Sequence, residues 1–383
     1  MARFSGKLST MNSELIELRH SLHRAAELSG NEVHTGEIIE EFLQGCGPDS
    51  LITGLGGNGI LCEYRGTVPG PCILLRCDMD GVPVEEAPNL PYRSENPGVS
   101  HKCGHDGHMS IMAGVARTLS KDPPERGSVL LLFQPAEETG SGAAAVLSDS
   151  AFSAYDPDYA FALHNLPGFP LGTVVTSPGP FAQGSRGFIV ELTGRSSHAG
   201  EPLLGVSPSR AVAALIPLLE EMSDHSSGTV ATVIHAVIGE RAFGTSPERA
   251  VVMATLRAPG NKQLESISRK AEELAAQTAD AHRLKHRISW TEEFPPTVNS
   301  PEADSVVRDA AASLGLATVA LEKPFPWSED FGHFTGRYKG ALFGLGSGTG
   351  SPPLHDPSYD FPDELIPMGT KLYMTMIERI NGT

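Results

Sequence analysis

The chain has 383 residues, of which 40% are hydrophobic and 20% are charged, a composition typical of a folded globular protein. This length exceeds that of one ordinary hydrophobic core, so we expect two domains. The formal net charge of −17 repels phosphate groups, which argues against nucleic acid or an anionic membrane as a partner.

The sequence also lacks the patterns of a secreted or membrane protein. Its beginning, MARFSGKLSTMNSELIELRH, contains no apolar segment of the kind found in signal peptides. No stretch approaches the roughly 18 apolar residues that a membrane-spanning helix needs. The five cysteines are few and odd in number, which favours free thiols in a reducing compartment. We therefore expect a cytoplasmic protein.

The first half of the chain alternates predicted helices with short apolar strands. Leucines at helical spacing predict one or two amphipathic helices within residues 13–43. Continuous apolar runs predict strands buried on both faces in segments 70–81, 127–138 and 158–165. Helices are predicted at 108–122 and 140–152. This alternation predicts an α/β fold with a parallel sheet, in which ligand sites gather at the carboxyl ends of the strands.

The pattern changes near residue 180. A strand (186–194) and a helix (208–222) are followed by two strands, a long helix (261–282) and a last strand (286–294). This βαββαβ order is typical of a ferredoxin-like domain. We predict a mostly parallel α/β domain formed by residues 1–180 and 293–383, interrupted by an inserted ferredoxin-like domain at 181–292.

The segment HKCGHDGHM (101–109) concentrates side chains that bind metals. In extended backbone, residues two apart point the same way, so Cys103 and His105 could bind one divalent ion or two adjacent ions. A buried thiol beside a helix cap and a Cys–His nucleophile pair are the alternatives.

Further candidate ligands follow predicted strands. Glu137 and Glu138 come directly after one strand, His164 ends another, and His355 lies in a Pro-rich loop. If the chain is extended at the glutamates, one carboxylate binds metal while the other faces a water. Alone, the acidic pair could begin a helix, and each histidine could be structural. Their shared placement at one end of one sheet favours a metal site.

Two other motifs are more ambiguous. Asp78 and Asp80 could orient a ligand histidine, or Asp80 and Gly81 could simply form a turn. The segment GLGGNG (54–59) matches a dinucleotide-binding pattern by letter, but a strand rather than a helix follows it. We therefore predict a hairpin turn there and no nucleotide cofactor.

Taken together, these motifs resemble those of the N-acyl-amino-acid amidohydrolases, which include hippurate hydrolase and the plant auxin-conjugate hydrolases. That family lies in the aminoacylase and carboxypeptidase G superfamily of di-metal peptidases. The matching segments occur in the family's order along nearly the whole chain: LRHSLHRAAELSGNE, LRCDMDGVPVEE, HKCGHDGHM, FQPAEETGSGA, ALHNLPGFPLG, GRSSHAGEP, SEDFG and LHDPSYDFPDE.

The resemblance implies a role for each matching residue. The ligands of two divalent ions would be Cys103, His105, Glu138, His164 and His355. The ions would be Mn²⁺ or Zn²⁺, with Ni²⁺ or Co²⁺ as alternatives, and they would activate a water. Glu137 would be the general base, and His198 would stabilise the oxyanion. Asp78 and Asp106 would be acids next to the ligands.

The resemblance further implies a small N-acyl amino acid, such as an N-acetyl or N-benzoyl compound, as the substrate. It also implies a homodimer formed through the inserted domain, with His198 acting in its own or in the partner's site. The alternatives are a dipeptidase or carboxypeptidase of the same superfamily, a non-catalytic metal-dependent binding protein, and a metal-free cysteine hydrolase.

This chain departs from the family pattern mainly around His198. Ser196 and Ser197 replace a Gly-Gly pair, Leu203 replaces a histidine, and the segment 244–247 lacks an asparagine associated with substrate binding. Ala26 replaces a common proline. These departures leave the proposed hydrolytic centre intact and bear on the choice of substrate.

Overall fold

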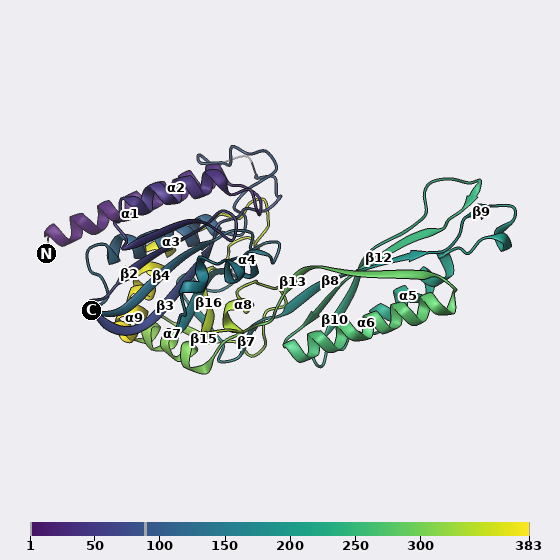
Figure 1. The fold of residues 1–383 in the computed structure, drawn as a ribbon. Helices are drawn as coiled ribbons and strands as arrows, with labels where there is room; N and C mark the ends of the chain where they lie inside the picture. The colour runs from purple at the N-terminus through teal and green to yellow at the C-terminus, as the bar shows by residue number, and fades with distance from the viewer. Residues whose placement is uncertain (1, 88–89, 383) are drawn as a thin grey trace. The chain divides into compact units, whose positions relative to one another are not determined.

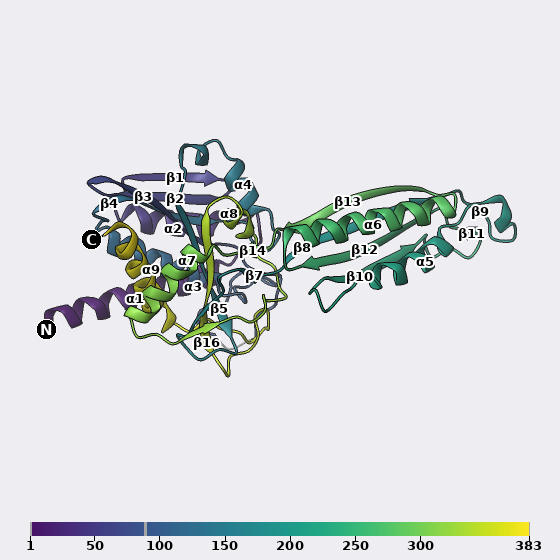
Figure 2. The same cartoon turned by 90° about the horizontal axis from the view of Figure 1, so that it is seen from below.

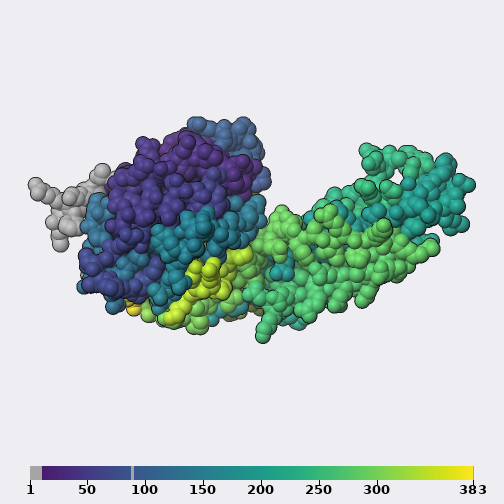
Figure 3. All heavy atoms as spheres, viewed as in Figure 1, coloured from purple at the N-terminus to yellow at the C-terminus, as the bar shows by residue number. Residues whose placement is uncertain are grey.

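The computed structural model describes residues 2–87 and 90–382. The chain divides into two compact units (Figure 1). The larger unit comprises Met1–Phe181, Thr297–Lys323 and Asp330–Thr383, and the smaller comprises Ala182–Pro296 and Pro324–Glu329. Segments from both ends of the chain, coloured purple and yellow in Figure 3, lie on the surface of the larger unit.

The larger unit is built on a sheet that has eight strands within the described residues, in the order β1-β2-β4-β3-β5-β16-β6-β15. The strands are β1 (Ser50–Leu55), β2 (Gly59–Arg65), β3 (Val68–Asp78), β4 (Arg126–Gln134), β5 (Tyr159–Pro167), β6 (Val174–Thr176), β15 (Thr318–Ala320) and β16 (Lys339–Gly348). The central strands β4, β3, β5 and β16 run parallel. The predicted mostly parallel sheet is therefore confirmed.

The antiparallel strands of this sheet lie outside its centre. β1 and β2 form a hairpin and β2 pairs with β4, while β6 runs antiparallel to β16. The GLGGNG segment makes the hairpin turn, in which the Gly57 amide donates to the Gly54 carbonyl. The predicted turn is confirmed.

The central strands contain continuous apolar runs, such as Ile73–Leu75 of β3, because both of their faces are covered there. Ile73, Leu75 and Cys77 of β3 belong to a core that they share with the helices on one face, whereas Leu74 is fully buried on the opposite face. That core includes residues of α1 (Ala2–Ala25), α2 (Val33–Gln44), α3 (His105–Leu119), α7 (Pro301–Ser313) and α9 (Leu365–Asn381). Burial of each large apolar side chain contributes about 1.5–3 kcal/mol.

Parallel pairing also places the functional segments. Asp78 at the end of β3 lies opposite Gln134 at the end of β4, and His164 of β5 lies opposite Gly344 of β16. The loops that follow these strands therefore begin at one edge of the sheet.

The helix predicted at 140–152 is shorter than expected. α4 (Gly142–Ser148) ends before Asp149, whose backbone is extended, and a short 3₁₀ helix (Phe152–Ala154) follows. The Asp149 carboxylate accepts hydrogen bonds from the amides of Gly56 and Ala151. This local bonding competes with continuation of the helix. The other short helix of this unit is α8 (Gly332–Thr335).

The smaller unit has the predicted βαββαβ order. Its elements are β8 (Gly184–Thr193), α5 (Ser209–Glu220), β10 (Val230–Ile238), β12 (Arg249–Ala258), α6 (Asn261–Ala281) and β13 (Lys285–Phe294). The four strands form an antiparallel sheet in the order β10-β12-β8-β13 within the described residues. Figure 2 shows α5 and α6 lying along this sheet, where they pack on alternate residues such as Val190 and Leu192.

Short paired strands complete the fold. β9 (Ser197–His198) pairs with β11 (Thr245–Ser246) near a 3₁₀ helix (Pro202–Leu204), and β7 (Pro180–Ala182) pairs with β14 (Thr297–Val298). No helix in the described part of the chain is long and apolar enough to cross a membrane. All five cysteines are free thiols.

Candidate metal centre

The predicted metal ligands converge at the carboxyl edge of the larger unit's sheet. Their donor atoms form three overlapping groups, and within each group all donor atoms lie within 4.8 Å of one another. The groups are Cys103 with His105 and His164, Cys103 with Glu138 and His355, and His105 with Glu137 and Glu138. Cys103, His105, Glu137 and His164 are at most 5% exposed.

Individual distances describe the same cluster. The Sγ atom of Cys103 lies 3.6 Å from Nε2 of His164. Oε1 of Glu138 lies 3.7 Å from Nε2 of His105 and 3.5 Å from Nε2 of His355. A single carboxylate oxygen thus faces imidazoles from α3 and from the loop after β16.

The backbone between Cys103 and His105 is a turn, so the prediction of an extended segment is wrong. Cys103 lies in the turn, Gly104 has a left-handed φ of 93°, and α3 begins at His105. A Cβ atom at residue 104 would lie 2.8 Å from the Asn165 side-chain amide. Glycine satisfies both the conformation and the close approach, and both ligand side chains still reach one cluster.

Glu137 and Glu138 also lie in a turn, which corrects the prediction that they point to opposite sides of an extended chain. The turn follows Ala136, whose φ is 53°. Hydrogen bonds from the Ala136 amide to Glu32 (2.8 Å) and from the Glu138 amide to Asp80 (3.0 Å) fix it. A left-handed non-glycine residue costs of order 1–3 kcal/mol and is typical of functional sites.

Two backbone carbonyls set the tautomers of the buried histidines. Nδ1 of His105 donates to the Asp80 carbonyl, and Nδ1 of His164 donates to the Asn165 carbonyl, each over 2.8 Å. Because a carbonyl only accepts hydrogen bonds, Nδ1 keeps its proton in each ring, and Nε2 is the atom that would present a lone pair to a cation in the cluster. This is the form in which histidine binds a metal ion.

Unpaired buried atoms indicate that the cluster fits a cation. Nε2 of His105 and Oε1 of Glu138 are buried, and neither has a hydrogen-bond partner among the described residues. An unsatisfied buried polar atom costs about 1–3 kcal/mol. A divalent ion bound to both atoms would remove that cost, and a set of thiol, imidazole and carboxylate donors suits Zn²⁺ or a similar ion.

The charges around the cluster favour a cation as well. Burial lowers the pKa of His105, but Asp78, Asp80 and Glu138 outweigh it and raise that pKa to about 10. Burial raises the pKa of the Cys103 thiol well above its usual range, and the nearby glutamates raise it further. A cation would displace both protons. The raised thiol pKa argues against Cys103 as a nucleophile in a metal-free hydrolase.

Asp78 lies beside the cluster, as the resemblance implies. Its carboxylate accepts a hydrogen bond from Nδ1 of His108 (2.6 Å) and from Arg76 (3.0 Å), and it lies 3.6 Å from Nε2 of His105. Burial raises its pKa, but His105, His108 and Arg76 hold that pKa well below its usual range. Asp78 is therefore a buried anion that faces His105.

A buried charged network joins the residues next to Cys103 and His105, and the sequence analysis missed it. Lys102 donates to Glu86 (2.5 Å) and to the Tyr359 carbonyl (2.8 Å). The ring of His23 bridges Glu86 (2.6 Å) and Asp106 (2.8 Å). Asp106, implied as an acid next to the ligands, instead contacts His23 and Arg19. The one signal in the sequence is LRHSLH, where helical spacing puts Arg19 and His23 on one face.

His198 belongs to the smaller unit. It lies in β9 opposite Thr245 of β11, its side chain is exposed, and its Nδ1 accepts a hydrogen bond from the Gly200 amide (3.1 Å). Its catalytic role stays a prediction.

Comparisons with known proteins show the family of this chain. The family model described as peptidase family M20/M25/M40 matches residues 74–379. The N-acetyl-L-cysteine deacetylase of Bacillus subtilis is 31% identical over 363 residues, covering 94% of this chain and 86% of the relative. The Arabidopsis thaliana IAA-amino acid hydrolase ILR1-like 4 is 28% identical, covering 95% and 85%. A Bacillus subtilis dinuclear metal-binding peptidase of the M20 family superposes with a TM-score of 0.83 at 25% identity, covering 98% and 99%.

The buried network predicts a pH dependence of stability. Burial raises the pKa of Glu86, but hydrogen bonds from His23 and Lys102 outweigh it and lower that pKa from 4.5 to about 2. The folded-state pKa thus lies below the unfolded-state value. The stabilisation is therefore complete above about pH 5 and is lost as the pH falls toward about 2.

We expect Glu86→Gln to lower the free energy of unfolding in urea at pH 6, and the difference from the wild type to shrink steadily toward pH 3. Glu37→Gln, at an exposed position, is the control and should show no such trend. A difference between Glu86→Gln and wild type that stays constant over this range would contradict the assignment.

Proposed function

Because this chain belongs to the peptidase family M20/M25/M40, we propose that it is a metal-dependent amidohydrolase that cleaves the amide bond of N-acyl amino acids. The observation that carries the proposal is the convergence of the five predicted ligand side chains, with Glu137 beside them. The relatives named as an N-acetyl-L-cysteine deacetylase and an IAA-amino acid hydrolase support an N-acylated amino acid as the substrate.

Two divalent cations would be held by Cys103, His105, Glu138, His164 and His355. When bound, such ions supply Lewis acidity, which polarises a carbonyl and lowers the pKa of a water. The thiol and imidazole donors suit Zn²⁺, whereas the carboxylate also suits Mn²⁺.

Glu137 is proposed to carry the proton during the reaction. A carboxylate oxygen of Glu137 lies within 4.8 Å of donor atoms of His105 and Glu138, and the residue is 5% exposed. It would accept the proton of the attacking water and deliver it to the leaving amine. His198 would donate a hydrogen bond to the oxyanion that develops on the amide carbonyl. Asp78 would keep His105 oriented.

We further propose a homodimer formed through the smaller unit. β10 lies at an edge of the four-stranded sheet. Three of its apolar side chains, Ile234, Val237 and Ile238, are 62%, 44% and 40% exposed. An edge strand with exposed apolar residues is suited to pairing with a second copy. The free thiols support a cytoplasmic location.

The activity itself is tested with purified protein and a panel of N-acetyl, N-benzoyl and indole-acyl amino acids. We expect hydrolysis of at least one class, loss of that hydrolysis in EDTA, and recovery when Zn²⁺, Mn²⁺ or Co²⁺ is added back. Hydrolysis that persists after complete metal removal, verified by elemental analysis, would contradict the proposal and favour a metal-free hydrolase.

The variant Glu137→Gln distinguishes the role of a general base from that of a metal ligand. The amide keeps the size of the side chain but cannot accept the proton, so we expect kcat to fall at least about 10²–10⁴-fold while the metal content stays at the wild-type value. Glu138→Gln is the matched control, because it should lower the metal content. A Glu137→Gln enzyme with wild-type kcat would refute the role of the base.

His198→Ala tests the oxyanion donor. Loss of one such donor costs about 10²–10³-fold in kcat, and we expect a loss of this size in kcat/KM with unchanged metal content. His225→Ala, at another exposed histidine of the smaller unit, is the control. If His198→Ala leaves kcat/KM within about threefold, His198 is an ordinary surface histidine.

A further inference from the structure

We propose that Arg19 is a positioning residue for His355, because its guanidinium group joins the segment that carries Cys103 and His105 to the loop that carries His355. The proposal rests on the proposed function, in which these three residues bind cations. It adds a role for a residue of α1 that lies outside the ligand cluster.

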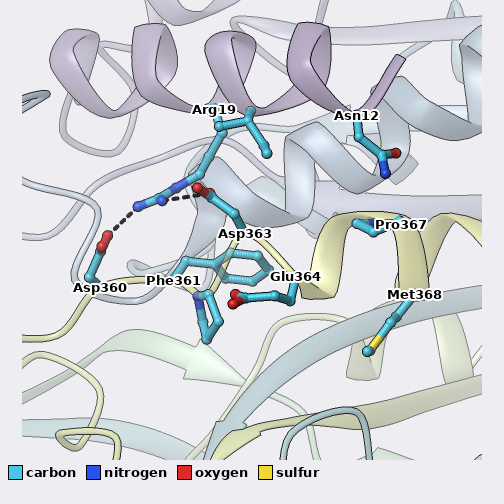
Figure 4. A pocket seen from close by; sticks show the side chains of 10 residues that line it. Asn12, Arg19, Asp360, Phe361, Asp363, Glu364, Pro367 and Met368 are labelled. Atoms are coloured by element: carbon cyan, nitrogen blue, oxygen red, sulfur yellow. Dashed lines mark hydrogen bonds and ion pairs between the residues drawn. The ribbon is translucent and has the colours of Figure 1, made fainter. Parts of the chain in front are cut away.

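Arg19 binds three carboxylates at once. Its side chain is 1% exposed, and its Nε donates to Oδ2 of Asp106 over 2.9 Å. Nη1 donates to Oδ1 of Asp363 over 2.8 Å, and Nη2 donates to Asp360. Figure 4 shows the guanidinium group directed at Asp360 and Asp363. We call this set of three ion pairs the Arg19 clamp.

The clamp connects two ligand-bearing segments. Asp106 directly follows the ligand His105 at the start of α3. Asp360 and Asp363 lie between His355 and the start of α9 at Leu365. One buried guanidinium group therefore fixes the distance between the first turn of α3 and the His355 loop. Arginine suits this task because its planar group presents several donors in a fixed geometry.

His355 depends on such support more than the other candidate ligands do. It lies in residues 349–364, a described segment that forms neither helix nor strand. Its side chain is 50% exposed, and its φ of 64° is left-handed. Its amide donates to the Lys102 carbonyl (2.8 Å), and Lys102 also donates to the Tyr359 carbonyl. Tyr359 is fully buried, so its side of the loop is anchored by packing.

Beyond Tyr359, packing and ion pairs anchor the loop together, because Phe361, which lies between the two clamp carboxylates, is 1% exposed and belongs to the core. A cavity of about 690 Å³ borders the clamp, lined by Arg19, Asp360, Asp363 and residues of α1 and α9 (Figure 4). Asp360 and Asp363 are 32% and 29% exposed. Ion pairs to the buried guanidinium group therefore hold the two partly exposed carboxylates that flank Phe361.

Removal of the two loop carboxylates should loosen the loop, which Tyr359 and Phe361 still anchor, without disturbing the buried Arg19–Asp106 pair. The test variant is Asp360→Asn with Asp363→Asn. Loss of a group that orients a ligand typically lowers metal affinity 10- to 100-fold. We expect the affinity of the purified protein for Zn²⁺, measured by competition with a chromogenic chelator, to fall by about that factor.

Two comparisons distinguish positioning from a general effect on the fold. Arg117→Met removes an ion pair with Glu14 that also joins α3 to α1 but does not reach the loop, so its Zn²⁺ affinity should equal that of the wild type. In a His355→Ala background, the Asp360→Asn/Asp363→Asn changes should cause no further loss of Zn²⁺ affinity. Non-additivity of this kind is the signature of two residues acting through one interaction.

The outcomes are separable. If the wild type binds no Zn²⁺, the proposed function fails. If the wild type binds Zn²⁺ and the double variant binds it within about threefold as tightly, the clamp proposal fails alone. An equal loss with and without His355 would also overturn the clamp proposal, because the carboxylates would then act on the fold rather than on His355.

Discussion

The rest of this structure depends on one constraint: polar atoms that could bind a metal are buried, without hydrogen bonds to any described residue, at the carboxyl edge of the parallel sheet. Nε2 of His105 and Oε1 of Glu138 lie out of contact with water and find no hydrogen-bond partner in the described chain. Carboxylates surround the same point and raise the pKa of His105 to about 10. An apolar core would not retain such an arrangement. A cation would satisfy both buried atoms and the negative charge together.

The surrounding fold brings these buried polar atoms together. Parallel pairing of β3, β4, β5 and β16 brings four connecting segments to one edge, so residues far apart in sequence share one cluster. The backbone is left-handed at Gly104, Ala136 and His355. The turns at these residues direct the neighbouring side chains toward the cluster. Carbonyls of Asp80 and Asn165 fix the imidazole tautomers. Hydrogen bonds and ion pairs among Arg19, His23, Glu86, Lys102 and Asp106 stabilise the backbone next to the predicted ligands Cys103 and His105.

The sequence predicted those features of the fold that depend on periodicity and composition. Continuous apolar runs marked the central strands because both faces of each are buried, and the order of elements marked the ferredoxin-like sheet of the smaller unit. It could not predict the turns at 103–105 and 136–138, because the argument from side-chain alternation assumes extended backbone. Nor could it pair Arg19 with Asp360 and Asp363, because nothing local links residues more than 300 positions apart. Leu203 is 96% exposed, so the fold does not require leucine there.

The account is tested most directly by a crystal structure of the protein loaded with Zn²⁺, in which the ions are located by anomalous scattering at the zinc absorption edge. It predicts two anomalous peaks per chain, each bonded to members of the set Cys103, His105, Glu138, His164 and His355, with the Glu137 carboxylate outside the first coordination sphere. Density that leaves this cluster empty, with the Cys103 thiol and the His355 imidazole too far apart to share an ion cluster, would contradict it.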